Sequence, residues 1–254
     1  MILVTNDDGI VAPGIRALVE VASKFGEVIV VAPDSPQSGQ GHAITLNQPL
    51  KLRKVNVFAG IEAYECSGTP VDCVKLAKNV LLKDKKIDLC VSGINHGANS
   101  SINIIYSGTM SAAMEASMEN IDSIGFSLLD FSFEADFTAA KIYAEKIIRY
   151  ILSNPMGDCK LLNVNIPACA PNEIKGMKVC RQGKGTWVEE FQEGVDPRGE
   201  KYYWLTGKFL SFEDPEDQYN DIYALKNKYV SIVPSGHDLT HYQTLAQIKN
   251  LENY

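Results

Sequence analysis

Short apolar runs alternate with longer mixed segments through the first two thirds of the chain. Each run is rich in Val, Ile, Leu and Ala with few polar interruptions, which is the pattern of a strand buried on both faces. The predicted strands are residues 2–5, 27–33, 87–93, 123–129 and 161–167. Burial on both faces is typical of parallel strands, because the connecting helices cover the sheet from two sides.

The segments between these runs carry apolar residues at helical spacing. One has Pro13 near its first position and ends at Gly26, as helices commonly do. Another begins with Thr69 as the N-cap, followed by Pro70 and then by Asp72, all of which favour a helix start. The predicted helices are residues 13–26, 69–82, 109–120 and 134–152.

Strands separated by single helices predict right-handed crossovers and therefore a parallel sheet. The expected fold class is α/β: a three-layer, mostly parallel, Rossmann-like sheet with helices on both faces. Ligands of such folds bind at the carboxyl ends of the strands. The residues that follow each predicted strand are therefore the first candidates for chemistry.

A polar and aromatic stretch interrupts this pattern in the last third of the chain. Residues 184–207 contain strand-like pieces split by Gly and Pro and predict a C-terminal β-hairpin arm outside the sheet. Two Trp and a Tyr pair in so polar a segment require apolar company, which a second subunit can supply. We expect a single domain over residues 1–254, with its core at residues 1–167 and 221–234.

Composition narrows the class of protein. The 254 residues are 45% hydrophobic, which suits one large globular domain. The net charge is -7 and no dense basic run occurs, so binding to a nucleic-acid polymer is not expected. No apolar run approaches the roughly 18 residues of a membrane span, and no signal-peptide pattern is present. The six cysteines lack C-x-x-C spacing, so we expect buried thiols in a cytoplasmic protein.

The first predicted strand is followed directly by Asp7 and Asp8, with no cationic residue beside them. Two adjacent carboxylates repel and raise each other's pKa unless they are solvated or share a cation. Taken alone, the Asp-Asp-Gly sequence fits an ordinary turn equally well, because Asp and Gly are turn formers. The ends of the neighbouring strands must decide between a turn and a cation site.

The second predicted strand leads into the sequence SPQSGQG. Ser38 offers a hydroxyl, while Gly39 and Gly41 allow the backbone to direct amide groups toward an anion. A glycine turn at the start of a hairpin explains the same stretch equally simply.

A long loop rich in Asn, Ser and Gly follows the third predicted strand, over residues 94–109. Loops of this length in a compact domain are usually functional or disordered. Asn95 and Asn99 are neutral oxygen ligands. Ser107 and Thr109 adjoin the start of a predicted helix, where free amides favour phosphate, although helix capping also explains these two residues.

Together the three strand ends offer carboxylate, hydroxyl and amide oxygens, which suit Mg²⁺ or Mn²⁺. No Cys or His cluster competes for a metal, since His42 and His96 are single loop residues. A G-x-G-x-x-G fingerprint and a P-loop are both absent. A phosphoacceptor signalling domain would need a third Asp at the end of the central strand, where residues 92–95 read SGIN. A non-catalytic, metal-dependent nucleotide sensor stays open as the alternative to an enzyme.

These motifs resemble the SurE family of survival-protein 5'/3'-nucleotidases. The resemblance covers nearly the whole chain, through ILVTNDDGIVAPGIRAL, APDSPQSGQGHAIT, SGTPVDCV, VSGINHGANSSINIIYSGTMSAAMEA, LLNVNIP, DPRGEKYYWLTG and DIYALKNKYVSIVP. It implies a phosphomonoesterase with one divalent metal ion per subunit, Mg²⁺ or Mn²⁺, acting on nucleoside 5'- and 3'-monophosphates. Short polyphosphate stays open as a further substrate. It also implies a homodimer or homotetramer, assembled through the C-terminal part, here residues 208–254.

The resemblance further assigns roles to individual residues. The implied metal ligands are Asp7, Asp8, Ser38 and Asn95, and the resemblance places Asn99, Ser107, Gly108 and Thr109 near the phosphate. Our own interpretation of the sequence adds Gly39 and Gly41 as substrate-binding residues, and takes Asp7, for proton transfer, and Asn99 as the catalytic residues. Ser101 replaces the usual Gly, Met110 the commoner Val, and Lys228 the Gly that precedes Tyr229. These departures concern fine loop geometry and substrate preference rather than the metal ligands.

Overall fold

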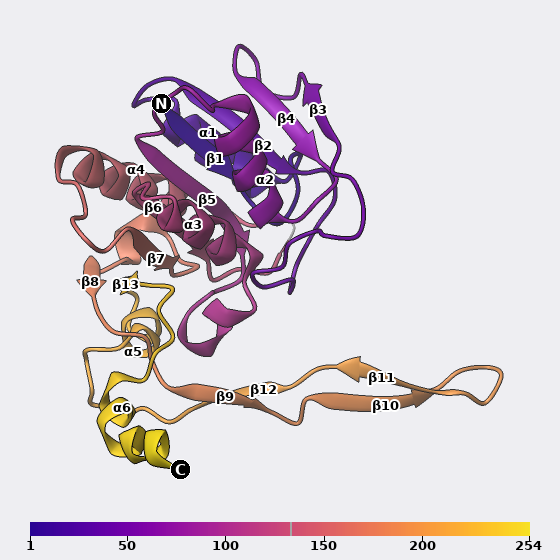
Figure 1. Ribbon diagram of the computed structural model, residues 1–254, viewed down its shortest axis with the longest axis vertical. Helices are drawn as coiled ribbons and strands as arrows, with labels where there is room; N and C mark the ends of the chain where they lie inside the picture. Colours follow the sequence, from indigo (N-terminus) through magenta and orange to yellow (C-terminus); the bar gives the residue numbers. More distant parts are fainter. Residues whose placement is uncertain (133) are drawn as a thin grey trace.

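In the computed structural model, which describes residues 1–132 and 134–254, a nine-stranded sheet forms the middle layer (Figure 1). Its strands are β1 (Ile2–Thr5), β2 (Val28–Pro33), β3 (Leu52–Val55), β4 (Glu62–Cys66), β5 (Leu89–His96), β6 (Ser123–Leu128), β7 (Leu161–Ile166), β8 (Met177–Val179) and β13 (Val230–Ser235). The order across the sheet is β3-β4-β2-β1-β5-β6-β7-β13-β8. All neighbours from β4 to β7 are parallel, whereas β3 and β13 pair antiparallel with β4 and β7. The predicted mostly parallel sheet is confirmed.

Helices cover both faces of this sheet, as the continuous apolar strands require. The helices α1 (Pro13–Ala22) and α4 (Thr138–Ser153) pack together over one face, and α2 (Pro70–Leu76) and α3 (Gly108–Met118) over the other. One apolar cluster lies between each helix pair and the sheet. The start of α2 has the predicted capping box between Thr69 and Asp72.

Several boundaries differ from the predicted ones. The helix α1 ends at Ala22, four residues earlier than predicted, and the chain then turns to reach Gly26. The helix α4 begins only at Thr138, and α2 continues as a π-helical turn, η1 (Ala77–Leu81). The strand β5 runs on to His96, so Asn95 lies on a strand rather than in a loop. Phe133, within the predicted core range, lies outside the described residues.

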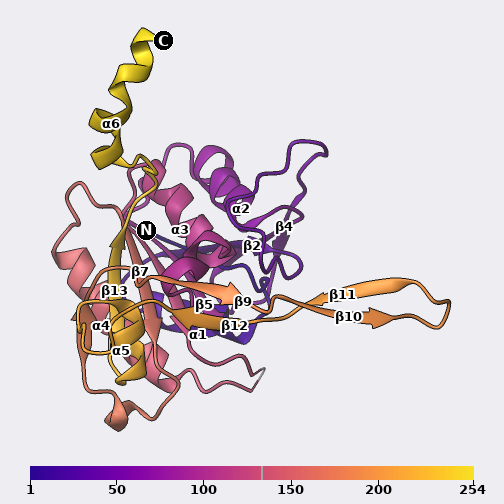
Figure 2. The same ribbon diagram turned by 90° about the horizontal axis from the view of Figure 1, so that it is seen from below.

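The predicted arm is confirmed and projects far from the sheet (Figures 1 and 2). It consists of two successive antiparallel pairs, first β9 with β12 and then β10 with β11. The bounds are β9 (Gly185–Val188), β10 (Phe191–Val195), β11 (Lys201–Leu205) and β12 (Lys208–Ser211). Every residue of β11 is exposed, so the outer arm has no apolar core of its own.

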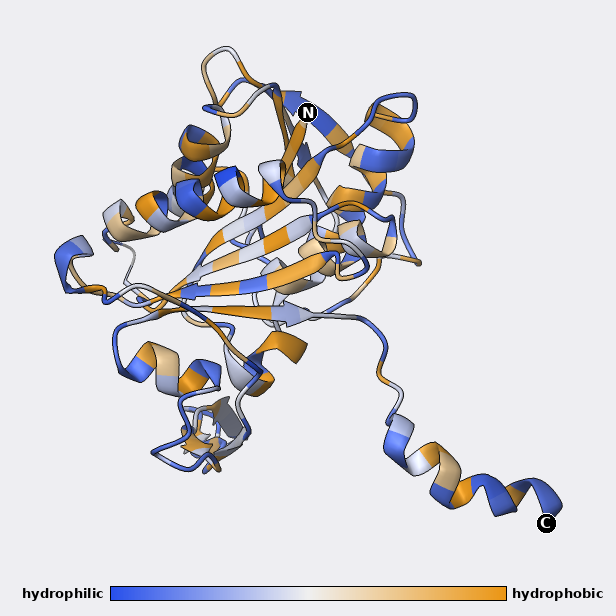
Figure 3. Cartoon of the chain, turned by 90° about the vertical axis from the view of Figure 1, so that its left-hand side faces the viewer, coloured by the Kyte–Doolittle hydropathy of each residue, from blue (hydrophilic) through white to orange (hydrophobic). Residues whose placement is uncertain are grey.

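After the arm the chain returns through α5 (Asp221–Lys226) to β13, and it ends in α6 (Tyr242–Ile248) and the 3-10 turn η4 (Lys249–Asn253). Figure 3 shows this last segment extending away from the sheet, and none of its helical residues is buried. Along the described residues, no helix has the length and apolar character needed to cross a membrane. All six cysteines are free.

Candidate metal and phosphate site

The sheet topology places a crevice at the carboxyl ends of β1 and β5. From β1 the chain crosses to β2 on one side, whereas from β5 it continues to β6 on the other side. Such a reversal leaves the two strand ends open between diverging connections. Asp7 and Asp8 follow β1, Asn95 lies near the end of β5, and Ser38 follows the adjacent β2. The fold therefore gathers all four predicted metal ligands at one edge.

Asp7 is the buried centre of this edge, with 4% of its surface exposed. Thr109 Oγ1 donates a hydrogen bond to Asp7 Oδ1, and the Gln37 amide donates to the Asp7 carbonyl oxygen at 2.8 Å. A Cβ atom on Gly108 would lie 2.7 Å from the Asp7 Cβ atom. Glycine at position 108 therefore allows α3 to begin directly against the carboxylate.

The carboxylate pair carries uncompensated charge. Burial, followed by repulsion from Asp8, raises the pKa of Asp7 from 3.8 to about 6, although the hydrogen bond from Thr109 opposes this. Within residues 1–132 and 134–254, no Lys or Arg forms an ion pair with Asp7 or Asp8, and no group of three or more His, Cys, Asp and Glu gathers. Two carboxylates beside hydroxyl and amide oxygens fit a hard divalent cation rather than zinc.

Asp8 and Asn95 are oriented by the end of β5. Asp8 Oδ2 lies 3.2 Å from His96 Nδ1, and the His96 ring packs edge-on against Phe137 with a centroid distance of 5.2 Å. Asn95 Nδ2 donates to the carbonyl oxygens of His96 and Gly97 at 3.2 and 2.8 Å. The side-chain oxygen of Asn95 is thereby left for an outside ligand. His96 was missed as a site residue, although its place beside Asn95 was a usable signal.

The loop after β2 closes the crevice from the other side. Gly39 and Gly41 have φ angles of 75° and 56°, a backbone region that favours glycine. The Gly41 amide donates to the Tyr106 carbonyl oxygen at 3.1 Å, so this loop is tied to the segment before Ser107. Ser38 is exposed, and its hydroxyl has no hydrogen-bond partner among the described residues, which leaves it available to a ligand.

A second contact fixes the chain just beyond Gly41. His42 Nε2 lies 2.9 Å from Glu115 Oε2, and Lys75 Nζ lies 2.6 Å from Glu115 Oε1. The Glu115 side chain is only 4% exposed, and its hydrogen bond to His42 is the main cause that lowers its pKa. His42 is therefore a structural residue that joins the loop to α3.

The start of α3 provides the anion-binding part of the edge. Ser107 Oγ accepts a hydrogen bond from the Met110 amide at 3.0 Å, so the capping interpretation is correct for Ser107. Thr109 instead bonds to Asp7. Gly108 contributes a first-turn amide beside the carboxylates, where the helix dipole favours phosphate, whereas the backbone amide of Thr109 also faces the Asp7 carboxylate and lowers its pKa.

Asn99 is held from the interior by a ring of side-chain hydrogen bonds. The backbone amide of Asn99 donates to Asn165 Oδ1 at 2.7 Å, and Asn163 Nδ2 donates to the backbone carbonyl oxygen of Asn99 at 2.8 Å. Asn165 Nδ2 donates to Asn163 Oδ1 at 2.8 Å, which closes the ring. Asn99 Nδ2 donates to Ser127 Oγ at 2.8 Å. We call Ser127, Asn163 and Asn165 the asparagine cradle. Because one amide hydrogen of Asn99 points inward, its contact with phosphate stays a prediction.

The asparagine cradle is the part of the site that sequence reasoning missed. Asn163 and Asn165 are at most 1% exposed and stand two positions apart in the otherwise apolar β7. Side chains at this spacing share one face of a strand, and buried amides require partners. The sequence LLNVNIP therefore signalled a buried polar contact, but it did not say that Asn99 would be the partner.

Known proteins share both the sequence and the fold. The family model for survival protein SurE matches residues 2–189. A protein named 5'-nucleotidase SurE from Flavobacterium johnsoniae is 56% identical over 249 residues, covering 98% of this chain and 95% of the relative. One of the same name from Cytophaga hutchinsonii is 54% identical over 248 residues, covering 98% and 95%. The crystal structure of the SurE protein from Aquifex aeolicus superposes with a TM-score of 0.85 at 40% identity and covers 99% of both chains.

Proposed function

This chain belongs to the survival protein SurE family, and we propose that it is a metal-dependent phosphomonoesterase that releases phosphate from nucleoside 5'-monophosphates. The proposal includes nucleoside 3'-monophosphates as substrates and short polyphosphate as a further one to be tested. It is supported by the names of the similar proteins, which are 5'-nucleotidases.

One observation carries the proposal: the pair of carboxylates without a Lys or Arg partner faces the first turn of α3. Asp7 is buried against Gly108 and Thr109, so a bound anion and a bound cation would be neighbours here. A phosphate monoester with a divalent cation satisfies both charges, because the cation neutralises the carboxylates and the helix amides contact the phosphate.

In the proposed mechanism, Asp7, Asp8, Ser38 and Asn95 hold one Mg²⁺ or Mn²⁺ ion per subunit. When bound, the ion supplies Lewis-acid polarisation of a phosphate oxygen and a lower pKa for a bound water. As the water oxygen bonds to phosphorus, Asp7 Oδ2, the oxygen that does not accept the hydrogen bond from Thr109 Oγ1, takes one proton of that water. The bond between phosphorus and the nucleoside oxygen breaks, and the nucleoside oxygen takes up a proton from solvent. The amide of Gly108, with Asn99, stabilises the phosphoryl oxygens as charge redistributes, and Thr109 orients the Asp7 carboxylate beside them.

The remaining substrate contacts come from the loop after β2. The left-handed Gly39 directs its amide toward the same phosphate. The Gly41 amide is instead bonded to the Tyr106 carbonyl oxygen, so the predicted role of Gly41 is limited to shaping the loop, while Ser107 sets the geometry of the helix start.

Assembly and location complete the proposal. We expect a cytoplasmic homodimer or homotetramer whose partners are nucleoside monophosphates, not membranes or nucleic-acid polymers. The exposed aromatic residues of the arm support assembly, since Trp204 is 66% and Phe191 66% exposed in a single subunit and apolar surfaces of this kind mark interfaces.

The direct test is a phosphate-release screen across nucleoside 5'- and 3'-monophosphates and short polyphosphate. We expect release with added Mg²⁺ or Mn²⁺ and none in EDTA, with recovery when the metal is restored. Equilibrium binding of the same nucleotides is measured in parallel. Metal-dependent binding without any phosphate release would replace the enzyme with a nucleotide sensor.

A further inference from the structure

One buried carboxylate joins the candidate site to the arm. Asp221 Oδ2 accepts a hydrogen bond from the Ser101 amide, and Asp221 Oδ1 accepts one from the Gly183 amide, both at 2.8 Å. Ser101 Oγ donates to the Gly183 carbonyl oxygen, also at 2.8 Å. Ser101 begins the 3-10 turn η2 (Ser101–Ile105), within the loop that leads to Ser107. Gly183 directly precedes the arm.

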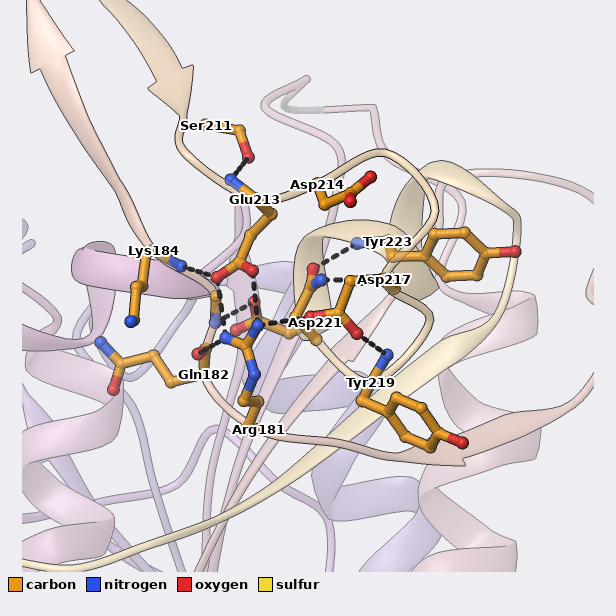
Figure 4. A network of polar contacts seen from close by, with 12 residues as sticks. Arg181, Gln182, Lys184, Ser211, Glu213, Asp214, Asp217, Tyr219, Asp221 and Tyr223 are labelled. Carbon is orange, nitrogen blue, oxygen red and sulfur yellow. Dashed lines mark hydrogen bonds and ion pairs between the residues drawn. The ribbon is translucent and has the colours of Figure 1, made fainter.

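The chain is fixed where the arm leaves the core. We call residues 181–184, before β9, and residues 211–217, from the last residue of β12 onward, the arm root. Arg181 donates to both oxygens of Glu213, at 2.7 and 2.5 Å, and to Asp217 at 2.5 Å. The Lys184 amide donates to Glu213 Oε1 at 2.5 Å. Figure 4 shows that these contacts and Asp221 form one network. The two segments of the arm root are therefore joined to each other.

A second contact joins the arm to the same turn. Trp187 Nε1 donates to Asn103 Oδ1 at 2.8 Å, and the indole ring packs edge-on against Phe209 with a centroid distance of 5.8 Å. In Figure 1 the loop that contains η2 lies beside the inner end of β9. The turn is therefore held by Asp221 at its first residue and by Trp187 at its third.

The backbone of η2 depends on such support. Ser101 has a φ angle of 54°, which is sparsely populated for residues other than glycine and persists where neighbours enforce it. Asp221 is fully buried. Burial raises the pKa of the Asp221 carboxyl, whereas the amide bonds from Ser101 and Gly183 lower it. An asparagine at position 221 has one acceptor oxygen and can satisfy only one of these two amides.

Displacement of η2 would shift two neighbouring parts of the proposed phosphate site, the start of α3 and the loop after β2. The backbone amide of Ser107, which caps α3, donates a hydrogen bond to the Ile104 carbonyl oxygen within this turn. The Gly41 amide bonds to Tyr106, the residue directly after η2. By contrast, Asp7, Asp8 and Asn95 are held by β1, β5 and Thr109, and they make no hydrogen bond to η2 or to the arm among the described residues.

We propose that Asp221 and Trp187 are positioning residues that hold η2 against the arm root, and so set the phosphate-binding geometry without contacting the substrate. This inference rests on the proposed nucleotidase function. It makes the placement of the arm root a determinant of substrate binding, separate from metal binding.

The test compares Trp187→Phe with Trp204→Phe, two identical substitutions in one arm. Trp187→Phe keeps an aromatic ring beside Phe209 but removes the donor to Asn103, whereas the indole of Trp204, in the outer pair β10–β11, packs edge-on against Tyr202. We expect KM for a nucleoside monophosphate to rise about 10-fold in Trp187→Phe, as for other residues that orient a site from outside. Affinity for Mn²⁺, kcat and the urea midpoint should change little. Trp204→Phe should leave KM unchanged, and Asp221→Asn should raise it at least as much as Trp187→Phe.

Hydrogen exchange over residues 99–107 gives a second measurement that requires no activity. Exchange should be faster in Trp187→Phe and Asp221→Asn than in the wild type, and unchanged in Trp204→Phe. In the double variant Trp187→Phe, Asn103→Ala, exchange should be no faster than in Trp187→Phe alone, because both substitutions remove the same hydrogen bond. Equal KM changes at positions 187 and 204, or unaltered exchange in both Trp187→Phe and Asp221→Asn, would overturn the proposal. If the wild type hydrolyses no nucleotide, the proposed function fails, and the exchange comparison still decides the coupling.

Discussion

The loop between β5 and α3 is held in two halves by different parts of the molecule. The first half ends at Asn99 and is bonded to the asparagine cradle on β6 and β7. The second half, η2, is bonded to Asp221 and to Trp187 beside the arm root. We call them the core-held half and the arm-held half.

The two supports differ in burial. The asparagine cradle lies within a sheet that is covered on both faces, and Asn165 is fully buried. The arm-held half has one buried support, Asp221, which is fully buried, and one near solvent, Trp187, which is 36% exposed. Hydrogen bonds in the low dielectric of a protein core are stronger, and their loss is more costly, than those near solvent. The hydrogen bond from Trp187 should therefore break more easily than those of the asparagine cradle, so the arm-held half should be the more easily displaced of the two.

The largest effect is expected at the proposed metal ligands Asp7 and Asp8, which neither half of the loop holds. Asp8→Asn removes one of the paired carboxylates, so we predict loss of phosphatase activity together with weak metal binding. Without metal, the free energy of unfolding should stay level or rise, because the substitution relieves repulsion between Asp7 and Asp8. Turnover at limiting metal and urea unfolding in EDTA check the two parts. Near wild-type turnover would remove Asp8 from the metal site.

The next largest effect should follow damage to the core-held half. Asn165→Leu has nearly the same shape but leaves the Asn99 amide and Asn163 Oδ1 without partners. We predict a fall in kcat of about 100-fold, since small misplacements of reacting groups have effects of that order. The free energy of unfolding should fall by about 1–3 kcal/mol for the unsatisfied groups.

Ser231→Ala is the matched control for this prediction. Ser231 lies opposite Asn165 on the neighbouring strand β13 and is equally buried, but its hydroxyl has no hydrogen-bond partner in the described residues. Its kcat should equal that of the wild type. If Ser231→Ala and Asn165→Leu lose activity to the same extent, the cradle is general packing rather than support for Asn99.

A smaller effect is expected from two deletions in the arm, which distinguish the role of the arm in assembly from its role in holding η2. Replacing residues 190–206 with a Gly-Ser bridge removes the exposed aromatics of the outer arm, each of which could contribute about 2 kcal/mol to an interface. We predict smaller species in sedimentation with little change in KM. Deleting residues 186–204 also removes Trp187, so it should raise KM about 10-fold while Mg²⁺ still binds. Unchanged oligomer mass in both deletions would exclude the arm from assembly and favour a lid over its own subunit.

The smallest effect is expected at the surface of the arm root. Arg181→Lys keeps the charge but loses the two-pronged contact with Glu213. Because the Arg181 side chain is 45% exposed, we predict that the free energy of unfolding falls by no more than about 1 kcal/mol. The change should shrink as salt is added, which screens exposed ion pairs. If the free energy of unfolding fell by several times this amount, the arm root would support the whole subunit.

The same contrast explains what the sequence could predict. The parallel strands and their helices follow from local apolar patterns, and the strand ends follow from the fold class, so Asp7, Asp8 and Asn95 could be placed together. The short strands β3, β4 and β8 were not predicted, because their partly exposed residues show no continuous apolar run.

The supports of the long loop could not be predicted for a different reason. Asn99 is separated from Asn165 by 66 positions, and Ser101 from Asp221 by 120 positions. Neither pair has a local pattern that names its partner. Two asparagines in an apolar strand indicate that a buried partner exists, but only the folded chain identifies it.

The central claim is that Asp7 and Asp8 bind one divalent cation at the carboxyl edge of β1 and β5. Anomalous diffraction at the manganese edge, from crystals of the wild type soaked in Mn²⁺, tests it most directly. We predict one manganese peak per subunit in contact with both carboxylates, with Ser38 and Asn95 on its remaining sides, and its loss in Asp8→Asn. A peak at another place in the molecule, or no peak at this edge, would contradict the metal site and the function proposed from it.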